Sequence, residues 1–232
     1  MFTGFTDATV DFMWGIRFNN ERSWFMAHKE DYQNHLYQPM KELGAEVQAR
    51  LLEKFPDSGL NLKISRIYRD ARRLFGRGPY KDHLWLSLFR WDGGEEGARP
   101  VLWFELAPEG WSYGMGFWCA KAVVMAKHRA RMDRDHRPLL KLANRLEKQT
   151  EFVLDGPEYS KMSGSAPHKN LVPWYRKKSL ALIHEEPLTE TIYTPELVDR
   201  LVEGFSFLMP YYDYFSTIWA DPDPRGGEKQ TN

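Results

Sequence analysis

Apolar side chains recur at helical spacing along the first part of the chain. Val10, Met13 and Phe18 fall on one face of a helix. Pro39 begins or kinks a later helix, because proline fits the first helical turn but not the interior. The pattern therefore predicts helices from residue 6 to about residue 54.

The period then changes to that of strands. Four apolar segments are separated by connections rich in glycine and proline, and they are residues 60–69, 83–91, 100–107 and 111–119. Their order predicts an antiparallel meander. Alternation places Leu84, Leu86 and Leu88 on one face, with Trp85 and Phe89 on the other. Helices are expected to cover the leucine face, whereas the aromatic face is either packed or partly open.

The second half of the chain adds helices and short strands. Helical composition returns from Lys121 to about Lys148, and residues 151–154 and 179–185 are two further candidate strands. A closing helix begins after Thr194, whose side chain suits the N-cap position.

These elements predict an α+β fold. A mainly antiparallel central sheet is expected, with about four meander strands plus one or two more, flanked by N-terminal, middle and C-terminal helices. One domain is expected over residues 1–220, followed by a flexible tail over residues 221–232, which is short of apolar side chains.

Composition limits the function classes. The 232 residues include 32 basic and 32 acidic side chains, so any recognition of anions must come from a local cluster. Cys119 is the one cysteine and cannot form an intramolecular disulfide, which fits a reducing compartment. No apolar run reaches the roughly 18 residues of a membrane span. We expect a cytoplasmic protein without a membrane partner.

Positive charge gathers in the stretch RIYRDARRLFGRGPYKDH at residues 66–83. Arg66 has the parity of the apolar strand positions before it, so it is expected to lean toward an apolar face. Guanidinium groups donate paired hydrogen bonds that suit phosphate or carboxylate. The expected ligand-binding residues are Arg66, Arg69, Asp70, Arg72, Arg77 and Tyr80, with Asp70 orienting the arginines.

Two further interpretations concern the same stretch. His83 and Tyr80 are the candidate proton donors for any reaction on a bound anion. The competing interpretation is a structural ion-pair network, in which Glu105 pairs with Arg66 or Arg69 across the sheet. We expect Arg66→Ala to impair both stability and anion binding, and Arg77→Ala to impair mainly binding.

The stretch resembles the signature RxxRDxRFxxxKxxY of a bacterial family called domain of unknown function 2461. Five positions match it: Arg66, Arg69, Asp70, Arg72 and Tyr80. Arg73 stands where the family has phenylalanine, and Arg77 stands where it has lysine. The resemblance covers roughly residues 2–215 and includes FTGF, NNERSWF, KDH and the closing helix. It implies no activity, because the function of the family is not established.

Three function hypotheses remain open. The first is a binding or enzymatic site for a small phosphorylated or carboxylated ligand. The second is a nucleic-acid-binding protein that uses residues 66–81 and 127–141, where Lys127, Arg131 and Arg134 form a helical stripe. The third is a structural or protein-interaction module in which YYDYFSTIW at residues 211–219 contacts an unknown partner.

No cofactor or metal is expected. The sequence contains no phosphate-binding loop and no dinucleotide fingerprint. His28 and His35 lie seven residues apart on an expected helix, but no recognised ligand spacing accompanies them.

Overall fold

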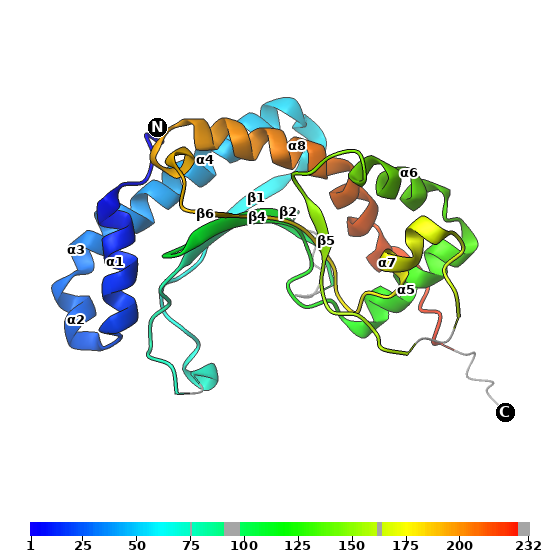
Figure 1. The fold of residues 1–232 in the computed structure, drawn as a ribbon, viewed down its shortest axis with the longest axis horizontal. Coiled ribbons are helices and arrows are strands. Elements are labelled where there is room, and N and C mark those ends of the chain that lie inside the picture. Colours follow the sequence, from blue (N-terminus) through cyan, green and yellow to red (C-terminus); the bar gives the residue numbers. More distant parts are fainter. Residues whose placement is uncertain (75, 91–97, 162–163, 227–232) are drawn as a thin grey trace. The chain divides into compact units, whose positions relative to one another are not determined.

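The structure is a computed structural model that describes residues 1–74, 76–90, 98–161 and 164–226. It confirms the predicted α+β class (Figure 1). The helices are α1 (Asp7–Phe18), α2 (Arg22–Ala27), α3 (Lys29–Asp31), α4 (Gln38–Lys54), α5 (Ala122–Arg134), α6 (Arg137–Leu146), α7 (Val172–Tyr175) and α8 (Glu196–Ser216). The strands are β1 (Leu60–Ile64), β2 (Leu84–Arg90), β3 (Val101–Ala107), β4 (Gly110–Gly116), β5 (Val153–Asp155) and β6 (Ala181–Pro187).

The strands form one antiparallel sheet in the order β1-β2-β3-β4-β6-β5. The first four strands are neighbours in chain order, as the meander prediction requires. Pairing of β1 with β2 places Leu62 opposite Leu88 and Lys63 opposite Ser87. The two strands expected from the second half of the chain are present as β5 and β6, and Val153 pairs with Ile183.

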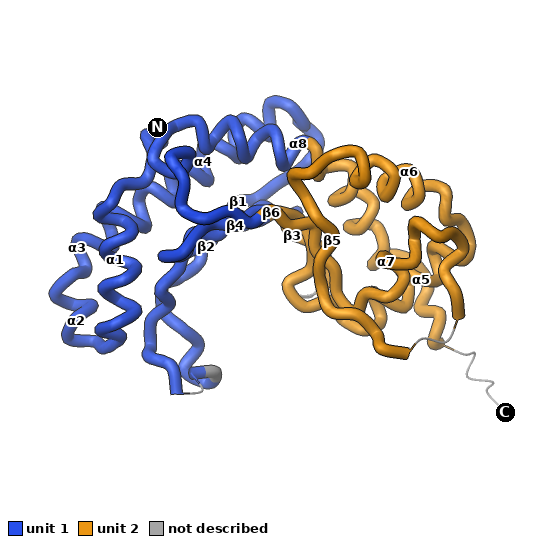
Figure 2. The backbone as a smooth tube through the Cα atoms, viewed as in Figure 1, with its two compact units in different colours: residues 1–91, 103–113, 185–206 blue, residues 92–102, 114–184, 207–232 orange. Residues whose placement is uncertain are grey.

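The chain divides into two compact units (Figure 2). Unit 1 comprises residues 1–91, 103–113 and 185–206, and unit 2 comprises residues 92–102, 114–184 and 207–232. The expectation of one domain over residues 1–220 stays a prediction.

Helices cover one face of the sheet in unit 1. In Figure 1, α4 and the first part of α8 lie on the same side of this sheet. Leu84, Leu86 and Leu88 are fully buried, as alternation predicts. Gly44 of α4 allows close packing on β1, because a Cβ there would lie 2.8 Å from Cδ1 of Leu62. On the opposite face Trp85 remains partly exposed.

Unit 2 has its own aromatic core. The ring of Trp174 stacks on the rings of Tyr211 and Phe215, with centroids 6.4 and 6.1 Å apart. His128 of α5 is buried beside the same Phe215 ring, 5.2 Å away. Across the described ranges, no helix combines the length and the apolar composition needed to cross a membrane.

Candidate functional site

The arginine-rich stretch folds back on itself in unit 1. The amide of Arg69 donates to the carbonyl of Pro79 at 2.8 Å, and the amide of Lys81 donates to the carbonyl of Ile67 at 2.7 Å. Asn20 holds the returning segment, because its side chain accepts from the amide of Tyr80 and donates to the carbonyl of Tyr80, both at 2.9 Å. NNERSWF, which contains Asn20, thus lies beside the signature, although the two are far apart in the sequence.

Arg66 does not lean toward an apolar face, and this part of the prediction was wrong. β1 ends at Ile64, and Ser65 is buried with its amide and its hydroxyl both bonded to the backbone of Trp85. Ser65 and Ile67 are both buried, so the alternation continues with the opposite parity after Ile64, and Arg66 is exposed. Arg66→Ala is therefore no longer expected to reduce stability strongly.

Asp70 binds the neighbouring Arg72. It caps the short 3-10 turn Ala71–Arg73 and accepts from the amide, Nε and Nη2 of Arg72 at 3.0, 3.0 and 2.9 Å. These bonds raise the pKa of the exposed Arg72 guanidinium. Arg77 is exposed in the same loop, and its Nε donates to the carbonyl of Leu74 at 3.4 Å. The side chain of Arg73 lies outside the described part of the structure.

Arg69 belongs to a partly buried network centred on Asp82. Its Nε donates to the carbonyl of Tyr80 at 2.7 Å, and its Nη2 lies 3.6 Å from Asp82 Oδ1. Arg17 of α1 donates through Nε to Asp82 Oδ2 at 2.6 Å and also binds Glu109 with two nitrogens. The acidic partner of Arg69 is thus Asp82, and not Glu105, which the competing interpretation pairs with Arg66 or Arg69.

The carboxylate of Asp82 organises this network electrostatically. The Asp82 side chain is only 16% exposed. Its hydrogen bond with His83 and then its contact with Arg17 hold the pKa of the carboxyl well below its usual value, against the effect of burial. The bond to Glu109 raises the pKa of Arg17. Arg17 is 65 residues from Asp82 and 92 residues from Glu109 in the chain. Local sequence patterns therefore did not identify these three residues as a network.

The two expected proton donors occupy different environments. Tyr80 is buried, with its ring stacked on Phe25 at 4.3 Å, and burial raises the pKa of its hydroxyl. His83 is 27% exposed, and its Nδ1 lies 2.9 Å from Asp82 Oδ1. Such a contact fixes the orientation of an imidazole ring and leaves Nε2 as its second polar atom.

Three cations in or beside the signature form no ion pair in the described part of unit 1. In the part of unit 1 that the structure describes, no ion pair joins Lys63, Arg66 or Lys81 to a carboxylate. The ammonium groups of Lys63 and Lys81 lie 5.9 and 5.5 Å from the centre of the Trp85 ring. Arg66 and Lys63 are exposed, whereas Lys81 is half-buried.

Lys81 experiences the combined charge of this group. Burial lowers the pKa of Lys81, and Arg69 lowers it further. Arg66 and Lys63 act in the same direction, whereas Glu105 opposes them. We call Lys63, Arg66 and Lys81 the cation group. Of its members, only Arg66 is predicted from the sequence to bind a ligand.

In the second basic region, residues 127–141, two of the three cations of the predicted stripe form contacts within unit 2. Lys127 is buried and donates to the carbonyl of Trp219 at 2.6 Å. Arg131 donates to Asp221 Oδ2 at 2.5 Å and to the carbonyl of Tyr214 at 3.0 Å. Two of the three cations in the predicted stripe therefore do not present their charge to solvent. Of the predicted tail, Asp221 is held by Arg131, and residues 227–232 lie outside the described part.

The aromatic segment at residues 211–219 packs inward. Tyr211, Tyr212, Phe215 and Ile218 are buried, and the hydroxyl of Tyr211 donates to the carbonyl of Leu142 at 2.9 Å. Most of its apolar surface is thus used within the chain rather than offered to a partner.

The histidine pair near the N-terminus makes local contacts. His28 stacks on Trp24 with centroids 3.9 Å apart, and its Nδ1 lies 2.9 Å from the Trp24 carbonyl oxygen. Among the described residues, no three histidine, cysteine, aspartate or glutamate side chains are grouped as metal ligands.

Comparison with known proteins agrees with the resemblance seen in the sequence. The model of a family described as a conserved hypothetical protein (DUF2461) matches residues 8–214, which include both the cation group and the Asp82 network. No match was found among the curated proteins. Because the match spans most of the sequence, the chain belongs to the DUF2461 family.

Proposed function

We propose that the protein binds an oxyanion, a phosphate or carboxylate group, at Lys63, Arg66 and Lys81. The observation that carries this proposal is the division of the basic residues into two sets. Arg17, Arg69 and Arg72 form ion pairs with carboxylates. Among the described residues no ion pair joins the cation group to a carboxylate, and Glu105 acts on Lys81 only through its charge. Like charges held together raise each other's free energy, and a bound anion relieves this repulsion.

Each member of the group has a different part in this proposal. The guanidinium of Arg66 offers a planar pair of donors to two oxygens of the anion. Lys81 is half-buried and adds a less hydrated charge, which interacts more strongly with an anion than an exposed one. Lys63 contributes a third charge from β1, and Trp85 forms an apolar wall beside both ammonium groups.

The Asp82 network orders residues next to the cation group. It fixes the backbone at Tyr80 through Arg69 and the side chain of His83 through Asp82. For any reaction on the bound anion, we infer that His83 rather than Tyr80 exchanges the proton. Tyr80 is buried and its pKa is raised, whereas His83 is partly exposed and oriented by a carboxylate.

Isothermal titration calorimetry with pyrophosphate and citrate tests the proposal, because these probes carry several phosphate or carboxylate oxygens. Arg66→Gln is expected to weaken binding of at least one probe about tenfold, which corresponds to about 1.4 kcal/mol. Arg72→Gln is the matched control, since Arg72 is an exposed arginine of the same stretch that is already paired with Asp70. Equal losses in both variants, or no binding by the parent protein, would contradict the proposal.

A further inference from the structure

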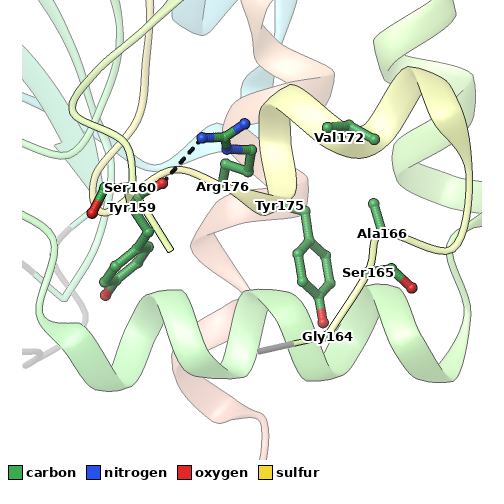
Figure 3. Close-up of a pocket in the computed structure, with 8 residues that line it drawn as sticks. All are labelled: Tyr159, Ser160, Gly164, Ser165, Ala166, Val172, Tyr175 and Arg176. Carbon is green, nitrogen blue, oxygen red and sulfur yellow. Dashed lines mark hydrogen bonds between the residues drawn. The ribbon is translucent and has the colours of Figure 1, made fainter. Parts of the chain in front are cut away.

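Unit 2 contains a pocket that no pattern in the sequence predicts (Figure 3). Its volume is about 310 Å³, which suits a small molecule rather than a polymer. Among the described residues it is lined by Tyr159, Ser160, Gly164, Ser165, Ala166, Val172, Tyr175 and Arg176. Figure 3 shows Tyr159 and Tyr175 on either side of Arg176, with α5 running beneath both rings.

Hydrogen bonds hold the hydroxyl of Tyr175 and the backbone of Tyr159. The hydroxyl of Tyr175 donates to Asp133 Oδ2 at 3.1 Å, and the residue is 7% exposed. Nη2 of Arg176 donates to the carbonyl of Tyr159 at 3.2 Å. The side chain of Tyr175 is therefore positioned before any ligand binds, which reduces the entropic cost of binding.

Positive charge surrounds the ring of Tyr159. The guanidinium carbon of Arg129 lies 5.2 Å from the ring centre, and the ammonium of Lys178 lies 5.3 Å from it. In the described part of unit 2, no ion pair joins either side chain to a carboxylate. Such contacts orient cations over aromatic faces without neutralising them.

The carboxylate of Asp133 accepts the hydrogen bond from Tyr175, and the carboxylate of Glu158 is shared by two cations. Lys177 is buried, and its ammonium lies 3.0 Å from Glu158 Oε1. Arg176 Nε lies 3.6 Å from the other oxygen of Glu158. One negative charge thus faces two cations, so that the charge of Arg176 is only partly balanced at the edge of the pocket.

We propose that this pocket binds a small organic anion. Its carboxylate or phosphate group lies against Arg176, and Arg129, next to the ring of Tyr159, adds positive charge nearby. Its apolar or aromatic body lies between the rings of Tyr159 and Tyr175, and the hydroxyl of Ser165 provides a further hydrogen-bonding group. This site is separate from the cation group. Its ligand must carry an apolar body that fits the pocket, whereas the cation group is proposed to bind the oxyanion group alone.

Saturation-transfer NMR and calorimetry on the full chain test this inference with four probes: phenyl phosphate, benzoate, inorganic phosphate and benzyl alcohol. Phenyl phosphate or benzoate is expected to bind at least tenfold more tightly than benzyl alcohol, which has the ring but no charge. Comparison of the first two probes shows whether the site prefers phosphate or carboxylate. Binding by none of the anions, or equal binding of benzyl alcohol, would overturn the inference.

Variants locate the binding. Arg176→Gln is expected to weaken the better anion at least tenfold, whereas Arg137→Gln, which changes an exposed arginine paired with Asp135, leaves it unchanged. Ala166→Trp fills the pocket without changing its charge and is expected to abolish binding, with far-UV circular dichroism to verify folding. Unchanged affinity in Arg176→Gln and in a folded Ala166→Trp would refute the site. Arg66→Gln is expected to have no effect here, which separates this test from that of the cation group.

Discussion

Acid should destabilise the protein through His128, well before its carboxylates titrate. The side chain lies in α5 and is fully buried, with its ring 5.2 Å from that of Phe215 and 6.4 Å from that of Tyr214. Burial lowers the pKa of His128 to about 3, and Arg129 acts in the same direction. The imidazole is therefore neutral in the folded protein across the ordinary pH range.

The sign and size of the effect follow from proton linkage. In the unfolded chain the pKa of a histidine is about 6.5, so below this pH the unfolded state binds a proton that the folded state does not. The stabilisation is complete above pH 6.5 and is lost progressively as the pH falls toward 3. At about 1.36 kcal/mol for each pKa unit, the free energy of unfolding should fall by about 2 kcal/mol between pH 7.5 and 5.0.

Urea denaturation followed by circular dichroism at pH 7.5 and 5.0 measures this loss. His128→Leu removes the titrating group and should reduce the pH-dependent loss by about 2 kcal/mol, whatever the absolute stability of the variant. His35→Gln is the control, because His35 is partly exposed and should leave the loss unchanged. If His128→Leu and the parent lose the same free energy, His128 is not the buried neutral histidine described above.

Three substitutions test the contacts around the site and the packing of α8 on β4 through the stability of the protein. Asn20→Ala removes both hydrogen bonds to the backbone of Tyr80 and should lower the free energy of unfolding by about 1–3 kcal/mol. A decrease below about 0.5 kcal/mol would show that these two bonds are unimportant for stability. Asp82→Asn removes the charge at the centre of the network and should cost about 2–3 kcal/mol, and an unchanged urea midpoint would contradict that role. Gly204→Ala places a Cβ against the buried ring of Tyr113 and should lower the thermal midpoint, and a rise would refute this close contact.

Hydrophobic patterns between residues close together in the sequence predicted the secondary structure well. Alternation in β2 identified the buried leucine face, because residues two apart along a strand share one environment. Helical spacing likewise identified α1, α4 and α8. The π-helical turn at Tyr32–Tyr37, between α3 and α4, was not predicted, because nothing in its sequence distinguishes it from the α-helix that surrounds it.

The candidate site was predicted only in part. Counting parity beyond Ile64 failed for Arg66, because Ser65 uses its side chain as well as its backbone to bind Trp85 and ends the regular strand. Composition correctly located a concentration of charge, but it could not assign partners. The pairing of Arg17 with Asp82 depends on tertiary structure, and no local pattern contains it.

The ionisation of Lys81 tests the central claim most directly. Carbon-13 NMR of isotope-labelled lysine, with Lys81→Arg to assign the signal, gives the pKa of this ammonium in the free protein and with pyrophosphate. We predict a pKa below 10.5 in the free protein, because burial and neighbouring cations disfavour the charge, and a rise when pyrophosphate binds. Arg66→Gln should reduce that rise, whereas Arg72→Gln should not. A pKa of Lys81 at or above 10.5 that pyrophosphate does not change would contradict an anion site at the cation group.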